Sequence, residues 1–283
     1  MTLRFGIIGD LHAYWDEMDV AQIDECGYDL VFFLGDLGGG TRNSTLRIAR
    51  LISGLNTKTL VLPGNHDTWE LGEIAAELAH RRGIRLITDI HRGASHSEKD
   101  VALCGYSVHR LTSQTVDVSL LVGRPHSLGG PELAFPEYMQ ETYGVDTMQA
   151  STDKLCSLVE GLESSDVIFL AHNGPLGLGG EANDMWGCDF RPDGGDWGDP
   201  DLTQAISHAR RQGHRVLGVV AGHMHLKTKG GDERPWKKLV DDTQFVNAAK
   251  VPRIYTEAGQ PVRHHVELIL DEDGLTFVER LLG

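Results

Sequence analysis

Five short apolar runs in this chain each lead, within three residues, to a polar side chain that can bind a metal ion. The runs cover residues 3–8, 30–34, 59–62, 167–170 and 216–220. Apolar runs of this length, bounded by glycine and proline, are typical of strands that are buried on both faces. Open α/β sheets bind their ligands at the carboxyl ends of such strands. We therefore predict an α/β fold in which polar residues far apart in sequence lie close together.

The motifs after these runs offer carboxylate, amide and imidazole donors but no thiolate. In chain order they are Gly9-Asp10-Leu11-His12, Gly35-Asp36, Gly64-Asn65-His66-Asp67, Ala171-His172-Asn173-Gly174-Pro175 and Gly222-His223-Met224-His225. Oxygen and imidazole ligands suit Mn²⁺, iron or Zn²⁺, and they argue against a cysteine-rich structural zinc site. The donors are too many for one ion that must also leave room for a substrate. Two ions that share one carboxylate, about 3.5–4 Å apart, are the simplest arrangement.

The ordered motifs match the pattern D-x-H, G-D, G-N-H-[DE], H and G-H-x-H in full. Between residues 7 and 225 the chain therefore resembles the calcineurin-like metallophosphoesterases. The resemblance implies a four-layer α/β/β/α sandwich, in which two mixed sheets are flanked by helices. It also implies seven metal ligands, namely Asp10, His12 and His225 at the first metal, Asn65, His172 and His223 at the second, and Asp36 as the bridge.

The resemblance also implies an activity. His66 would be the catalytic residue that faces the substrate and protonates the leaving oxygen. The expected reaction is hydrolysis of a small phosphomonoester or phosphodiester, nucleotide-like substrates included, by attack of a hydroxide that bridges the metals. The cofactors would be two divalent transition-metal ions (Mn²⁺, Fe²⁺/Fe³⁺ or Zn²⁺), and we expect Mn²⁺ to support activity in vitro.

Each motif taken alone has an ordinary structural explanation. A Gly-Asp pair after a strand is usually a turn. The segment Asn65-His66-Asp67 has residues that commonly cap a helix. His172 lies in a looser motif, where a turn histidine whose ring caps a backbone carbonyl is the alternative. The five motifs in family order after five strands are far more specific than any one of them, and they favour the functional interpretation.

Two departures from the family pattern bear on the subclass. Protein serine/threonine phosphatases have an arginine in a Gly-Asp-x-x-Asp-Arg context, and their next motif ends in glutamate. Here Asp36 is followed by Leu-Gly-Gly-Gly-Thr and then Arg42, and the next motif ends in Asp67. This favours small-molecule esters over a protein phosphatase, with Arg42 as a candidate replacement for the missing arginine. A non-catalytic scaffold of the same fold is the other alternative, but it would have little reason to retain His66.

Composition limits the partners and the location. The formal net charge of −15 disfavours long nucleic acids and anionic membranes, because both are polyanions. A small phosphate ester remains compatible, since bound cations would make the site locally positive. No apolar run approaches the length of a membrane span, and the 4 cysteines are scattered. We expect a cytoplasmic protein; the sequence leaves its oligomeric state open.

We predict a single domain over residues 1–283, with substrate-determining insertions at 107–150 and 176–199. The first contains Arg124, which would suit bidentate contact with phosphate, although a surface turn explains it equally well. The second is a long Gly- and Asp-rich stretch with Trp186 and Trp197. Because it follows His172 directly, we expect it to be a lid over the metals, with Trp186 as a candidate contact to the substrate.

Periodicity predicts the remaining elements. We expect helices over 17–26, 44–55, 70–82 and 151–162, and strands over 243–248, 262–270 and 275–282, the last two joined by a hairpin loop at 271–274.

Overall fold

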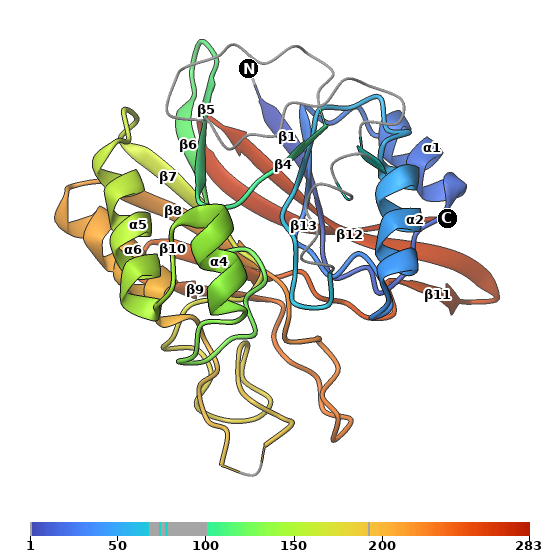
Figure 1. Ribbon diagram of the computed structural model, residues 1–283. Coiled ribbons are helices and arrows are strands. Elements are labelled where there is room, and N and C mark those ends of the chain that lie inside the picture. Colours follow the sequence, from blue (N-terminus) through green and yellow to red (C-terminus); the bar gives the residue numbers. More distant parts are fainter. Residues whose placement is uncertain (1, 68–73, 75–76, 79–100, 192) are drawn as a thin grey trace.

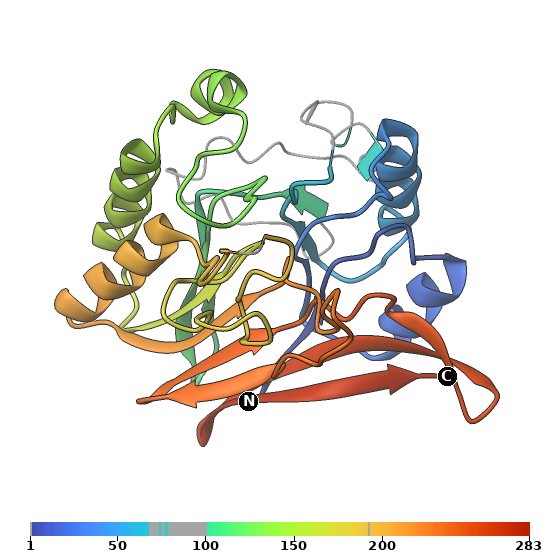
Figure 2. The same cartoon turned by 90° about the horizontal axis from the view of Figure 1, so that it is seen from below.

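Two sheets face each other and carry helices on their outer sides (Figures 1 and 2). This computed structural model describes residues 2–67, 74, 77–78, 101–191 and 193–283. The predicted helix over 70–82 lies almost entirely outside these residues. Among the described residues, no helix is both long and apolar enough to cross a membrane.

The first sheet is built around parallel strands that the apolar runs predicted. Strands β1 (Leu3–Ile8), β2 (Leu30–Phe33), β3 (Thr59–Val61) and β4 (Val101–Leu103) are parallel neighbours. Strand β12 (Gln260–Asp271) pairs antiparallel with β1, and it also pairs with β11 (Ile254–Glu257) and β13 (Gly274–Leu282). The chain therefore returns at its end to cover the free side of its first strand.

The second sheet has the strand order β5-β6-β7-β8-β10-β9. Its parallel centre consists of β6 (Asp117–Val122), β7 (Asp166–Leu170), β8 (Arg215–Ala221) and β10 (Thr243–Asn247). Antiparallel strands close both edges, β5 (Ser107–Thr112) on β6 and β9 (Lys237–Val240) on β10. The carboxyl ends of β7 and β8 therefore lie side by side.

Three apolar clusters define four layers. Side chains from both sheets, such as Phe32 and Leu268 of the first and Leu120 and Val220 of the second, form the central cluster. A second cluster packs the first sheet against α1 (Glu17–Glu25) and α2 (Arg42–Ile52). A third packs the second sheet against α4 (Pro136–Tyr143), α5 (Met148–Glu160) and α6 (Pro200–Arg211). The predicted α/β/β/α sandwich is confirmed.

Local signals explain where several helices begin. Asp16 caps α1, and its side chain and that of Asp19 form a reciprocal capping box. Thr41 caps α2 through the backbone N–H of Ser44. Helices α4 and α6 both begin with proline, whose fixed φ suits the first helical turn.

The region 107–150 contains more regular structure than a substrate-determining insertion would. Strands β5 and β6 lie within it, and Leu120 and Val122 of β6 are buried in the central core. Helix α6, which directly follows the glycine-rich segment 176–199, was also not predicted from the sequence. The boundaries of the single predicted domain remain a prediction.

Truncation of Leu268 in β12 is expected to destabilise the fold strongly, because this side chain is fully buried between the sheets. We expect Leu268→Ala to lower the free energy of unfolding by about 2–5 kcal/mol, measured by urea denaturation. Leu281→Ala in β13 is the matched control, since Leu281 is 46% exposed, and it should change stability by only about 0.5 kcal/mol. Equal losses in the two variants would contradict the proposed core.

Candidate metal centre

Strand ends of both sheets deliver the predicted ligands to one place. Asp10, Asp36 and Asn65 follow β1, β2 and β3 of the first sheet, whereas His172 and His223 follow β7 and β8 of the second. Two groups of donor atoms result, and within each group the atoms lie within 4.8 Å of one another. The residues that the sequence predicted to converge therefore do converge.

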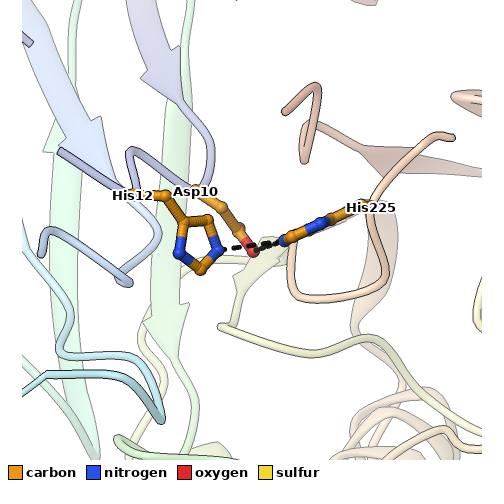
Figure 3. Close-up of side chains that lie close together, drawn as sticks. All are labelled: Asp10, His12 and His225. Atoms are coloured by element: carbon orange, nitrogen blue, oxygen red, sulfur yellow. Dashed lines mark hydrogen bonds and ion pairs between the residues drawn. The ribbon is translucent and has the colours of Figure 1, made fainter. Parts of the chain in front are cut away.

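The first group consists of Asp10, His12 and His225, which point toward one another from opposite sides (Figure 3). The Nε2 atoms of His12 and His225 are 3.0 Å apart, and His225 Nε2 is 3.6 Å from Asp10 Oδ2. Asp10 is only 1% exposed. Its carboxylate also accepts the backbone N–H of His223 at 3.1 Å, which joins the two sheets at this point.

The second group consists of Asp36, His172 and His223. His172 is fully buried, and its Nδ1 lies 2.7 Å from the carbonyl oxygen of Leu34. A proton on Nδ1 satisfies that carbonyl and leaves Nε2 free to bind a cation. His172 Nε2 lies 2.8 Å from Asn65 Oδ1, so the predicted amide ligand belongs to this group as well.

Asp36 lies between the two groups. Its Oδ2 is 3.5 Å from His12 Nε2, and its Oδ1 is 3.5 Å from His172 Nε2. The two oxygens of one buried carboxylate therefore face different sets of imidazoles. This is the arrangement that a carboxylate shared between two cations requires.

Three of the predicted ligands adopt a backbone conformation that side chains usually avoid. The φ angles of His12, Asp36 and His223 are 43°, 50° and 65°. Residues other than glycine in this left-handed region cost free energy, and they concentrate at functional sites. The loops hold them there through backbone contacts, such as the hydrogen bond from His12 N–H to Asp36 O at 2.8 Å.

Burial and neighbouring charges set the protonation of the ligands. Burial, together with charge repulsion from His172, lowers the pKa of His223 to about 4, so this imidazole is neutral at pH 7. Burial would raise the pKa of Asp10, but the hydrogen bond from His225 and the other imidazoles bring it below its ordinary value. Burial likewise opposes charge on His172, yet Asp36 and Asp10 raise its pKa. The site thus concentrates anionic oxygens and basic nitrogens.

The donor set fits a pair of transition-metal ions. Both ring nitrogens of His223 are buried without a hydrogen-bond partner in the described structure. A buried neutral imidazole with no partner is costly, and a cation removes that cost. The facing nitrogens of His12 and His225 leave room for one proton at most, whereas a shared cation satisfies both. Neutral histidines and ionised aspartates are the forms that bind metals.

Asp67 ties two of the ligand loops together. Its carboxylate accepts the N–H groups of Leu37 and Gly64, both at 2.9 Å. Burial, with the nearby charge of Asp36, raises the pKa of Asp67 to about 7. Its observed contacts therefore fix the loop after β2 against the loop after β3.

A cavity of about 440 Å³ opens over this centre. Its lining includes the site residues Asp36, Asn65, His66, His223 and His225. Its outer walls come from Leu128, from Asp189, Phe190, Arg191 and Trp197 of the segment 176–199, and from Lys227 and Lys229 beyond β8. The segment 176–199 thus forms a wall of the pocket beside the ligands, and its function as a lid stays a prediction.

Arg124 does not line the pocket. It is 2% exposed, and its guanidinium pairs with Asp199 at 3.0 Å and with Asp201 at 2.9 Å. Asp199 in turn accepts the hydroxyl of Ser127 at 2.7 Å. The hypothesis that Arg124 contacts the substrate is therefore wrong for this structure, because the side chain is buried outside the pocket lining and its Nε and Nη2 donate to two carboxylates. Its role is to fix the start of α6.

The other two candidate substrate contacts also lie elsewhere. Trp186 is 0% exposed and packs within the second sheet's outer core, where its ring leaves no room for a side chain at Gly174. Arg42 begins α2 on the surface and is outside the pocket lining. Trp197, from the same segment as Trp186, is the tryptophan that reaches the pocket. A sequence pattern does not reveal which of two nearby tryptophans points inward.

Several residues of the pocket were not anticipated. Phe190, Arg191, Lys227 and Lys229 line it, although no motif marked them. The only sequence signal for them was the closeness of Lys227 and Lys229 to the predicted ligand His225.

Gly64→Ala is expected to abolish metal binding, because a Cβ at this position would lie 2.3 Å from Asp36 Oδ1 and 2.6 Å from the His172 ring. Metal content after loading and desalting, measured by mass spectrometry, should fall well below that of the wild type. Gly39→Ala is the control, since its Cβ would meet nothing closer than 4.0 Å. Full metal occupancy in a folded Gly64→Ala protein would contradict this geometry.

Arg124→Ala is expected to destabilise the protein by about 3–5 kcal/mol, because it leaves two buried carboxylates without their cation. Chemical denaturation measures the loss, and Arg211→Ala on the exposed face of α6 provides the control. A stable Arg124→Ala protein with only a raised KM would restore the substrate-binding role.

A family model described as calcineurin-like phosphoesterase matches residues 3–227. No curated protein matches the chain significantly. Among solved structures, TT1561 of Thermus thermophilus is 12% identical with a TM-score of 0.56, and the alignment covers 98% of this chain and 99% of that one. A dimetal phosphatase from Danio rerio is 14% identical with a TM-score of 0.57, covering 98% and 96%.

A third similar structure, GAP50, is described as the anchor in the inner membrane complex of Plasmodium. It is 10% identical with a TM-score of 0.51, covering 98% of this chain and 84% of that one. At these identities the structural likenesses establish the fold alone. The family match extends over most of the chain and contains every predicted ligand, and this chain is therefore a member of the calcineurin-like phosphoesterase family.

Proposed function

We propose that this protein is a dinuclear-metal phosphoesterase that hydrolyses a small phosphomonoester or phosphodiester. The observation that carries the proposal is the position of Asp36, whose two carboxylate oxygens face two separate sets of imidazoles in the lining of a pocket. A single metal would leave one of these sets without a role.

The chain's own residues divide the work between holding cations and receiving the substrate. Asp10, His12 and His225 would hold one cation, and Asn65, His172 and His223 the other, with Asp36 between them. Two cations bound there would supply an activated water and positive charge for the phosphoryl oxygens.

His66 is the best candidate for the proton donor. Its ring is exposed in the pocket, with its centroid 5.2 Å from that of His12. Its backbone N–H donates to Asp36 Oδ1 at 2.8 Å, which fixes the residue beside the metal ligands. An imidazolium in this place can give its proton to the departing oxygen of the ester.

Charge and size favour a small substrate. The buried carboxylates of Asp10 and Asp36 repel an anion until cations neutralise them, so phosphate binding depends on the metals. A cavity of about 440 Å³ accommodates a phosphate and a modest leaving group. Arg42, the residue proposed to replace the arginine of protein phosphatases, lies outside this cavity.

Two chromogenic substrates test the proposal. We expect hydrolysis of 4-nitrophenyl phosphate or bis(4-nitrophenyl) phosphate with added Mn²⁺, and loss of that activity with a chelator. The faster substrate identifies the monoester or diester preference. A folded protein that binds metals but hydrolyses neither ester, nor an unactivated alkyl phosphate, would favour the non-catalytic scaffold.

His66→Ala is expected to retain both metals and to lose about 10²–10⁴ of kcat on an unactivated alkyl ester, because the leaving alkoxide then lacks a proton donor. The loss should be smaller on 4-nitrophenyl phosphate, whose leaving group needs little protonation. His208→Ala on α6 is the control, since this ring pairs with Glu160 away from the pocket. Near-wild-type rates of His66→Ala on the alkyl ester would refute the assignment.

A further inference from the structure

Three cationic side chains gather at the mouth of the pocket. Arg191 comes from the segment 176–199, and Lys227 and Lys229 come from the loop after β8; all three are exposed and line the cavity. The chain as a whole carries 41 acidic and 26 basic residues. This opening therefore gathers positive charge, although the chain as a whole is negatively charged.

Within the described residues, these three cations lack the acidic partner that several arginines of the chain have. Arg110, Arg215 and Arg253, for example, each pair with an aspartate at 2.6–2.8 Å. In the part of the chain that the structure describes, no carboxylate lies within ion-pairing distance of the side chains of Arg191, Lys227 or Lys229. Their charge is thus available to a ligand.

Aromatic rings hold two of these cations in place. The guanidinium of Arg191 lies 4.6 Å from the centroid of the Trp197 ring, and the ammonium of Lys229 lies 5.4 Å from that of Phe190. The two rings contact each other edge to face, with centroids 5.3 Å apart. Cation–π contacts of this kind fix a cation without neutralising it, so its hydrogen-bond donors remain free for an anion.

The same assembly is tied to the metal centre. Asp189 accepts the backbone N–H of Lys229 at 2.7 Å and pairs with the buried Arg234 at 3.3 Å. Arg234 Nε also donates to the carbonyl oxygen of His225 at 3.0 Å. The backbone of Lys229 is therefore linked through Asp189 and Arg234 to His225, a proposed metal ligand that lines the same cavity.

We propose that Arg191, Lys227 and Lys229 form a second anion-binding subsite, which selects phosphate esters whose leaving group carries another phosphate. This inference rests on the proposed function, because the metals would hold the phosphate that is cleaved. The leaving group would lie between the two anions along the wall formed by Phe190 and Trp197. The preferred substrate is accordingly a small bisphosphate rather than a monophosphate ester of an uncharged alcohol.

A matched pair of ligands tests the subsite. Glucose 6-phosphate and glucose 1,6-bisphosphate share the sugar and differ by one phosphate. Their affinities can be measured by calorimetry on the Mn²⁺-loaded His66→Ala protein, in which hydrolysis is expected to be slow, and, where the wild type hydrolyses a chromogenic ester, as initial-rate competitive inhibition constants. We expect the wild type to prefer the bisphosphate by roughly tenfold at low salt, from two or three solvent-exposed charge contacts. The preference should shrink as salt is added.

Variants assign the preference to the subsite. In Arg191→Gln/Lys229→Gln the bisphosphate preference should fall to about twofold or less, because affinity for the bisphosphate drops much more than affinity for glucose 6-phosphate. Trp197→Leu should reduce it partially, because Arg191 loses its support. Lys238→Gln replaces an exposed lysine of β9 outside the cavity and should leave the preference unchanged.

The outcomes separate the two proposals. Equal affinities of the wild type for the two ligands, or a preference that survives in the double variant, would overturn the subsite. Failure of the proposed function is a different result, namely no hydrolysis of any ester. The calorimetric comparison on His66→Ala does not need turnover, so it tests the subsite whether or not the wild type hydrolyses esters.

Discussion

The placement of one buried carboxylate, that of Asp36, governs the arrangement of the rest of the site. It is 1% exposed, its residue adopts φ of 50°, and its two oxygens face imidazoles that belong to different sheets. An ionised group in such surroundings needs compensating positive charge. Backbone N–H groups supply part of this compensation, as the hydrogen bond from His66 shows. The remainder is what a pair of cations would provide.

The sequence alone predicted the sheet-forming strands and the convergence of the ligands. Strand β1 was predicted with its observed bounds, because a continuous apolar run bounded by Gly9 is a strong local signal. Asp10 and Asp36 lie at one edge of the first sheet because parallel strands present their carboxyl ends together, and His172 and His223 lie at the facing edge of the second sheet for the same reason. The backbone geometry of the fold therefore determines the site, and the ordered set of motifs, rather than any one local pattern, made it recognisable.

The directions in which side chains point were harder to predict from the sequence. Arg124 and Trp186 both lie in segments that approach the pocket. Arg124 instead forms buried ion pairs, and Trp186 packs in the core between the second sheet and its helices. Arg191 and Lys229 are the converse case, since nothing in their local sequence distinguishes them from ordinary surface cations. Their significance comes from tertiary contacts with Trp197 and Phe190, which no periodicity encodes.

The division of the ligands between the two sheets has a mechanical consequence. Asp10 and Asp36 belong to one half of the sandwich, and His172, His223 and His225 belong to the other. Cations coordinated by both halves would cross-link the two sheets. Their binding energy would then add to the cohesion of the native state through mass action, which couples catalytic competence to resistance against unfolding.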